Sequence, residues 1–168
     1  SSHYRTSRMP SSAWKKKTDG LKILLIEPNK RQSELLSGIL LDLNYQVIRA
    51  NNINSATEKL IHFSPNLIVC QKNLNESSGF LFYNMLRNKL SNSETPFILL
   101  LNDFDKKDLS LCFEMGIEGC IYPPFESVKL ANILHHQLEK ISSKKPDAAG
   151  QFKTFFEATP FGFFICKN

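Results

Sequence analysis

The sequence has few cysteines, and their spacing does not suit the usual cysteine-based sites. They lie at positions 70, 112, 120 and 166, without a C-x-x-C pair and without a histidine at ligand spacing. A structural zinc site and a disulfide-stapled secreted fold are therefore not expected. A reducing compartment fits this usage best.

Long hydrophobic runs and glycine-rich loops are also missing. No apolar run is long enough to cross a bilayer, and the polar N-terminus does not resemble a signal peptide. The segment "EPNKRQ", which follows the first predicted strand, contains no glycine, so a phosphate-binding loop for a nucleotide is not indicated. We expect a cytoplasmic protein with no membrane partner and no cofactor.

The positive charge of the chain is concentrated at its N-terminus. The formal net charge is +5, and residues 1–20 contain five basic residues against one Asp, which leaves about +1 for the remainder. We interpret residues 1–20 as a basic, flexible leader, and give residues 1–8, which precede Met9, no weight in the fold. Such charge runs usually remain solvated, so we do not expect nucleic acid as a partner.

Short apolar runs alternate with amphipathic segments five times between residues 21 and 141. Three of the runs are nearly continuous Leu, Ile and Val, which is typical of strands covered on both faces. Strands are predicted at 21–27, 46–50, 66–71, 96–102 and 119–123, and helices at 30–43, 55–63, 78–90, 105–115 and 126–141. Short loops between strands and helices require crossover connections, so we predict a doubly wound α/β domain with a parallel five-stranded sheet.

Two polar clusters look like metal sites at first sight. The first contains Asp103, Asp105 and Asp108, which fit better as the capped, solvated start of the helix at 105–115, where acidic residues favour the positive end of the helix dipole. The second pairs His135 with Glu139, but no third ligand follows at metalloprotease spacing. We predict no metal site in either cluster.

Four phrases of the sequence resemble the response-regulator receiver domain over residues 21–141. They are "KILLIEPNKRQSELL", "PNLIVCQKNLNESSGFLF", "TPFILLLND" and "MGIEGCIYPPF". The order and length of the segments agree with the resemblance, as do Gly79, Thr95-Pro96 and the Pro-Phe after the fifth strand. The resemblance implies a flavodoxin-like sheet with strand order 2-1-3-4-5, helices on both faces, and a cis bond at Pro123–Pro124.

The residues that would perform receiver chemistry have been replaced. Receivers transfer a phosphoryl group to an aspartate at the end of the third strand. An acidic pair after the first strand holds Mg²⁺, and a hydroxyl residue and a lysine engage the phosphoryl oxygens. The resemblance places Gln71, the pair Glu27-Pro28, Leu101 and Pro123 at these positions. An amide is not a nucleophile, and one carboxylate is a poor Mg²⁺ site.

We therefore hypothesise a pseudo-receiver that has no catalytic residue, is not an enzyme and signals without phosphorylation. Its partner would be a protein, such as a regulator, a kinase or a linked sensor or output domain. The alternative is a small-ligand-binding or enzymatic α/β domain that has refitted the same rim with Glu27, Asn29, Gln71 and Asn102. One carboxylate without His, Lys or an activated nucleophile is a poor catalytic set, so we prefer the pseudo-receiver.

The C-terminal part has a different composition from the rest of the chain. Residues 142–150, "SSKKPDAAG", have the composition of a linker. Residues 151–168 are rich in Phe, and "FFEATPFGFFICKN" resembles the start of a PAS domain, with a short helix turning at "TPFG" into a strand. The alternative is an amphipathic helix that folds back on the sheet domain. In both cases so many Phe side chains indicate an interface.

The same reasoning predicts a docking surface. In the helix at 105–115, Leu109, Cys112, Phe113 and Gly116 form a core-facing stripe, and Leu111 points to solvent. Phe152, Phe155 and Phe156 have the spacing of one helical face. We hypothesise that Leu111 and these three Phe residues form an interface, for a partner or a homodimer, on the face of the fourth and fifth helices.

Overall fold

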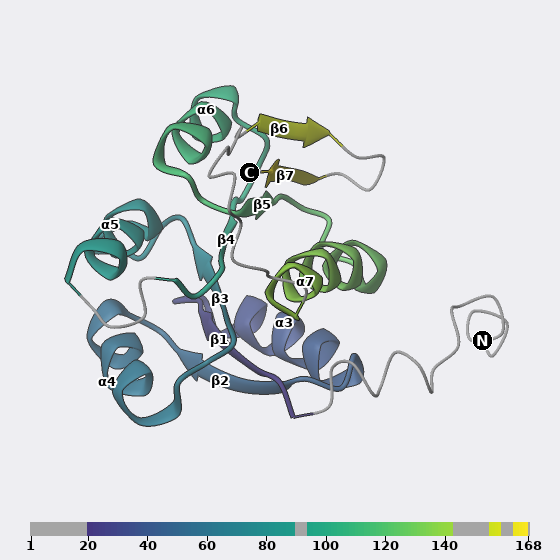
Figure 1. The fold of residues 1–168 in the computed structure, drawn as a ribbon. Helices are drawn as coiled ribbons and strands as arrows, with labels where there is room; N and C mark the ends of the chain where they lie inside the picture. The colour runs from purple at the N-terminus through teal and green to yellow at the C-terminus, as the bar shows by residue number, and fades with distance from the viewer. Residues whose placement is uncertain (1–19, 90–93, 143–154, 159–162, 168) are drawn as a thin grey trace, which may run out of the picture.

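The computed structural model describes residues 20–89, 94–142, 155–158 and 163–167 (Figure 1). Its centre is a parallel sheet of β1 (Lys22–Ile26), β2 (Gln46–Ala50), β3 (Leu67–Gln71), β4 (Phe97–Leu100) and β5 (Gly119–Ile121). These strands are arranged in the order β2-β1-β3-β4-β5. The predicted strand order and fold class are confirmed.

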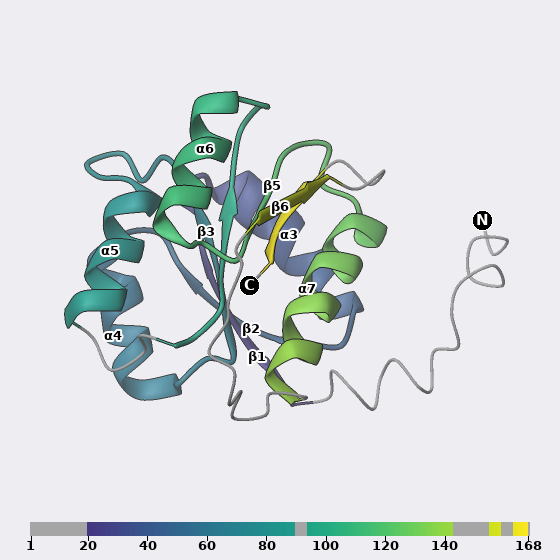
Figure 2. The ribbon, with the colours of Figure 1, turned by 45° about the horizontal axis from the view of Figure 1, so that its top comes forward.

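The helices form two layers, one on each face of the sheet (Figure 1, Figure 2). One layer contains α4 (Ile53–Phe63), α5 (Gly79–Lys89) and α6 (Lys106–Met115). The other layer contains α3 (Lys30–Asp42) and α7 (Ser127–Ser142). Within the described residues, no helix is both long and apolar enough to cross a membrane.

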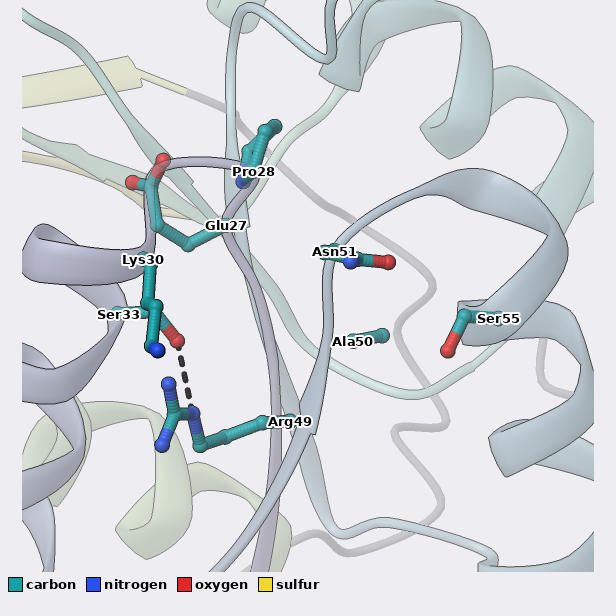
Figure 3. Close-up of a pocket in the computed structure, with 8 residues that line it drawn as sticks. All are labelled: Glu27, Pro28, Lys30, Ser33, Arg49, Ala50, Asn51 and Ser55. Carbon is teal, nitrogen blue, oxygen red and sulfur yellow. Dashed lines mark hydrogen bonds between the residues drawn. The ribbon is translucent and has the colours of Figure 1, made fainter.

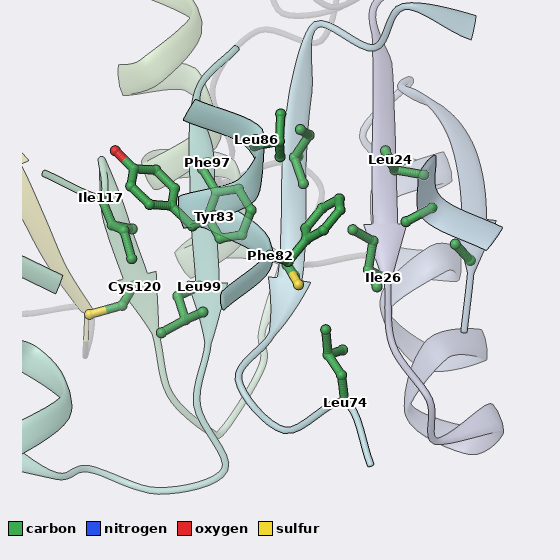
Figure 4. Packing of buried hydrophobic residues seen from close by; sticks show 14 of the residues in the cluster. Leu24, Ile26, Leu74, Phe82, Tyr83, Leu86, Phe97, Leu99, Ile117 and Cys120 are labelled. Carbon is green, nitrogen blue, oxygen red and sulfur yellow. The ribbon is translucent and has the colours of Figure 1, made fainter. Parts of the chain in front are cut away.

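Each central strand supplies side chains to two separate cores, because successive residues of a strand point to opposite faces. In β1, Leu24 and Ile26 belong to the core under α4, α5 and α6, where Figure 4 shows them with Phe82 of α5, whereas Ile23 and Leu25 pack with α3 and α7. Phe82 of α5 is fully buried in the first core. Burial on both faces explains why these strands are continuous apolar runs rather than alternating ones.

The ends of the helices are set by local polar contacts. The N-cap of α4 is Asn52, whose side chain accepts a hydrogen bond from the Ser55 N–H at 2.7 Å. The helix therefore begins two residues earlier than predicted. Gly116 ends α6 with a φ of +79°, a left-handed conformation that glycine adopts without strain. The Pro123–Pro124 bond is cis, as predicted.

Gly79 allows α5 to start directly against the end of β3. A β-carbon at this position would lie 2.7 Å from the carbonyl oxygen of Gln71 and 2.7 Å from Cδ1 of Leu99. The Gly79 N–H donates to the carbonyl of Lys72 at 2.7 Å. Only a residue without a side chain fits here, so the loop after β3 has both of its ends fixed.

The C-terminal segment adds a hairpin to the sheet. β6 (Phe155–Ala158) and β7 (Phe163–Lys167) are antiparallel, and β7 pairs antiparallel with β5. The complete order is β2-β1-β3-β4-β5-β7-β6. The hairpin covers the edge of β5, which would otherwise expose unpaired backbone groups.

Part of the prediction for this segment is wrong. Phe155 and Phe156 lie in a strand, so they do not share a helical face. Aromatic residues next to an open sheet edge favour a strand, and this outweighed the i, i+3 and i+4 spacing on which the helical prediction rested. Phe152, most of the predicted linker and nearly all of the predicted leader lie outside the described residues.

Candidate functional site: the carboxyl rim of the parallel sheet

The parallel strands end at one rim, which carries the residues singled out from the sequence. Glu27 follows β1, Gln71 is the last residue of β3, and Leu101 follows β4. Backbone hydrogen bonds continue to this level, from Glu27 N–H to the Ala50 carbonyl at 3.0 Å and from Leu101 N–H to the Ile121 carbonyl at 2.8 Å. The rim residues are therefore held on rigid backbone.

Glu27 and Gln71 are in direct contact. Nε2 of Gln71 donates to Oε1 of Glu27 at 2.9 Å, and each residue is 3% exposed. The first turn of α3 supplies two more donors to the same carboxylate, Nε2 of Gln32 at 2.7 Å and the backbone N–H of Asn29 at 3.1 Å. Because three neutral donors satisfy the buried carboxylate, it is stable without a cation.

The orientation of the Gln71 amide follows from its neighbours. Its nitrogen faces the Glu27 carboxylate, which can only accept, and its oxygen accepts from the Asn73 N–H at 3.5 Å. The reversed amide would place two acceptors against each other. At this position the side chain holds Glu27 in place and supplies no nucleophile.

The remaining rim positions supply no polar side-chain group. Leu101 is fully buried in the core beneath α5 and α6. Pro123 is exposed and has no hydrogen-bond donor. In the refitted rim considered as an alternative, Glu27 and Gln71 do meet, and Asn29 joins them through its backbone. Asn102 is exposed, and no described hydrogen bond connects it to the other three.

Two lysines near the rim were missed by the sequence reasoning. Lys72, next to Gln71, forms an ion pair with Asp108 of α6, with 2.9 Å between Nζ and Oδ2. Lys129 in the first turn of α7 is 6% exposed, and its Nζ donates to the Tyr122 carbonyl at 3.1 Å. It also lies 5.6 Å from the Tyr122 ring centroid, within cation–π range. No sequence motif marks either lysine, because the partners, Asp108 and Tyr122, lie on other segments of the chain.

The acidic cluster before α6 is only partly as predicted. Asp105 is the N-cap of α6 and accepts from the Lys107 N–H at 2.8 Å. Asp108 was expected to be solvated but is 8% exposed, because its partner Lys72 reaches across from the β3–α5 loop. His135 pairs with Glu139 on the surface of α7, at 2.8 Å. In the described part of the chain, no group of three acidic, His or Cys side chains could hold a metal ion.

Cys70 lies directly beneath the rim. It is fully buried in β3, and burial raises the pKa of its thiol well above the usual value, with the Glu27 charge adding to the shift. The thiol therefore remains protonated and is not a nucleophile.

The predicted core stripe of α6 needs one correction. Cys112 is buried and Leu109 packs beside it, but Phe113 is 38% exposed, the same as Leu111. Met115 packs against the core instead. Phe104, in the loop before α6, is 47% exposed and makes an edge-on contact with Tyr122, with 5.4 Å between ring centroids.

A pocket of about 450 Å³ opens beside Glu27, between the ends of β1 and β2 (Figure 3). α3 and α4 both begin at its edge. It is lined by Glu27, Pro28, Lys30, Ser33, Arg49, Ala50, Asn51 and Ser55. Of these, only Glu27 and Pro28 were candidate site residues from the sequence.

Curated proteins that are similar in sequence to this chain include transcriptional regulatory proteins. A transcriptional regulatory protein of Bacillus subtilis, YvcP, which is described as uncharacterized, is 26% identical over 129 residues, covering 74% of this chain and 53% of its own length. This chain spans about half the length of the curated relatives that it matches.

Solved receiver structures share the fold. A putative response regulator from Chloroflexus aurantiacus has a TM-score of 0.68 at 21% identity, covering 72% of this chain and 99% of the other. The receiver domain of a Syntrophus aciditrophicus signal transduction histidine kinase has a TM-score of 0.67 at 25% identity, covering 79% and 100%. The family model described as response regulator receiver domain matches residues 23–135. The chain belongs to the response regulator receiver domain family.

Proposed function

We propose that this chain is a pseudo-receiver, a signalling module that works without phosphorylation and acts through contacts with other proteins of a two-component-type regulator or sensor. The proposal is carried by the buried hydrogen bond between Gln71 and Glu27. An amide occupies the phospho-acceptor position, and it uses the one remaining carboxylate of the rim as its own partner.

The surroundings of this pair support the same conclusion. Phosphoryl transfer depends on a nucleophile and on groups that neutralise the charge of the transferred oxygens. Leu101 turns inward to the core and Pro123 has no donor, so neither provides such a group. The Lys129 amine is engaged by the Tyr122 carbonyl and ring rather than offered to the rim.

Without a phosphoryl switch, partner binding is the remaining way for the domain to transmit a signal. Apolar side chains are exposed on and before α6, at Phe104, Leu111 and Phe113. Beside them β6 forms the outer edge of the sheet in the order given above. Exposed apolar residues next to a strand edge favour docking of another chain, and we propose this part of the surface as the interface.

The test of the phosphorylation claim uses the full chain with acetyl phosphate and Mg²⁺, read by intact mass. A receiver domain with the complete acidic set serves as the positive control in the same reaction. We expect the control to gain a phosphoryl group and this chain to gain none. A phosphoryl adduct that disappears when Glu27 is replaced by Gln would show that the rim is still active.

A further inference from the structure

The pocket beside Glu27 contains two basic side chains without an anionic partner. Lys30 and Arg49 are both exposed, and within the described residues neither forms an ion pair. Figure 3 shows their charged ends pointing toward each other at one end of the pocket. Two cations that converge in this way repel each other unless an anion lies between them.

The positive ends of two helices meet at the same place. Lys30 and Ser33 belong to the first turn of α3, and Ser55 belongs to the first turn of α4. Neither first turn contains an acidic residue that would neutralise the helix dipole. At the start of α3 the Glu27 carboxylate already accepts from the Asn29 N–H, so it compensates part of that dipole, whereas the start of α4 has no such carboxylate among the described contacts and favours an anion.

The inner wall of the pocket provides a buried hydroxyl group. Ser33 is 3% exposed, and its Oγ accepts a hydrogen bond from Nε of Arg49 at 2.9 Å. This bond directs the guanidinium into the pocket. Among the described residues, no acceptor is found for the proton of the Ser33 hydroxyl, so it remains available for a ligand.

The one acidic residue of the lining does not cancel this charge. Glu27 contributes one negative charge against the two positive charges of Lys30 and Arg49. Its carboxylate oxygens are held by Gln71, Gln32 and the Asn29 N–H, and in Figure 3 they point away from the two basic ends. The pocket as a whole therefore attracts anions.

The opposite wall indicates what else the ligand carries. Asn51 and Ser55 face the pocket from the end of β2 and the start of α4 (Figure 3). The lining contains no aromatic side chain on which a base could stack, and its apolar part is limited to Pro28 and Ala50. The volume, about 450 Å³, is within the range of small-molecule sites.

We infer that this pocket binds a small, polar metabolite carrying a phosphate group, with the phosphate between Lys30 and Arg49 and the hydroxyl groups of the ligand near Asn51 and Ser55. The site is independent of the proposed loss of phosphorylation. It would give the domain a ligand input at the rim.

The experiment is a titration of the full chain with glycerol phosphate, followed by calorimetry and by the amide NMR signals of the protein. Glycerol without phosphate is the neutral control ligand. The ionic strength is kept near 0.1 M, where interactions beyond about 10 Å are screened. We expect saturable binding of glycerol phosphate but not of glycerol, with the largest shifts at Ser33, Asn51 and Ser55.

Three variants separate this site from general surface charge. Arg49→Gln and Lys30→Gln should each weaken binding about tenfold or more, as expected for one charged hydrogen bond. Lys106→Gln is the matched control, because Lys106 is likewise an exposed first residue of a helix. It should leave the affinity unchanged. Because Lys30 has no hydrogen-bond or ion-pair partner among the described residues, its variant keeps the test valid even if Arg49→Gln fails to fold.

Three results would overturn the inference. The first is that glycerol phosphate does not bind saturably. The second is that Lys106→Gln weakens binding as much as Lys30→Gln, which would indicate non-specific attraction. The third is that a polyglutamate peptide shifts the same amides while glycerol phosphate does not, which would assign the surface to an acidic protein partner.

Discussion

Nε2 of Gln71 lies 2.9 Å from Oε1 of Glu27, and this contact joins the ends of β3 and β1 inside the protein. In the receiver arrangement described above, both positions carry acids, the phospho-acceptor aspartate and one member of the pair that holds Mg²⁺. Here an amide replaces one acid, and the repulsion between two carboxylates becomes a hydrogen bond. The substitution therefore stabilises the rim in the absence of a metal.

The variant Gln71→Asp tests the proposed loss of phosphorylation chemistry at the rim. The change restores a carboxylate at the phospho-acceptor position, but Pro28, Leu101 and Pro123 still lack the other groups. We expect no phosphorylation by acetyl phosphate with Mg²⁺, measured by intact mass. We also expect a loss of about 1–3 kcal/mol in the free energy of unfolding, because Glu27 loses a donor and gains a like charge.

Gln71→Asn is the control for that variant, since it shortens the side chain without adding charge. It should be less destabilised than Gln71→Asp at neutral pH in urea unfolding. Strong labelling of Gln71→Asp would contradict the proposed pseudo-receiver, because it would mean that one residue restores the reaction.

Tyr45 and Tyr83 are a matched pair of buried tyrosines. The hydroxyl of Tyr45 is buried without a hydrogen-bond partner in the described part of the chain, whereas the hydroxyl of Tyr83 donates to the Gly116 carbonyl at 3.0 Å. Tyr45→Phe should leave the free energy of unfolding unchanged or raise it by up to about 1 kcal/mol. Tyr83→Phe should lower it by about 1 kcal/mol. Equal losses in both variants, measured by urea unfolding, would contradict the assignment.

Glu118 gives the fold a specific pH dependence. Nη2 of Arg87 lies 3.1 Å from Oε1 of Glu118, and the same carboxylate accepts a hydrogen bond from the Phe97 N–H at 2.7 Å. Burial nevertheless raises the pKa of Glu118 above its usual value, and these partners offset the shift only in part. Between the unfolded and the folded pKa, the folded protein holds a proton that the unfolded chain has released. The contribution of Glu118 to stability is therefore full at lower pH and is lost as the pH rises through the folded pKa.

The measurement compares wild type with Glu118→Gln by urea unfolding between about pH 4 and pH 7. The difference in unfolding free energy, wild type minus variant, should decrease as the pH rises. An increase would mean that the ion pair with Arg87 outweighs burial.

The proposed interface predicts a change of assembly when the C-terminal hairpin is removed. The full chain should be dimeric or larger at micromolar concentration by light scattering, and a chain ending at residue 144 should be mostly monomeric. The shorter chain retains the whole segment matched by the family model, so it is expected to fold. Two monomers would contradict homodimerisation through this surface.

The sequence was sufficient for the sheet and the rim, and insufficient for contacts between distant segments. Runs such as 66–71 identify buried strands because both of their faces are apolar. The helix predicted at 55–63 begins two residues too late, because the residue that caps α4 is Asn52. Phe113 was assigned to the core because helical spacing shows which residues share a face of α6. It does not show how much of that face the rest of the protein covers.

The pocket illustrates the same limit. Lys30 and Arg49 belong to different elements, and they meet because β1 pairs in parallel with β2, with Ile26 opposite Ala50. No local sequence pattern indicates that two such residues lie close together. The hairpin at β5 was missed for a related reason, since pairing with an edge depends on which strand is left at the edge.

The close approach at Gly79 has a consequence for how this rim can vary. The loop from Lys72 to Ser78 is anchored at both ends, by the Gly79 N–H on the Lys72 carbonyl and by the lack of room for a β-carbon. Because both of its ends lie against β3, adding or removing a residue in this loop is expected to displace Gln71. A position with no side chain thus sets the length of the loop. A change of residue type within the loop is therefore expected to disturb the rim less than a change of its length.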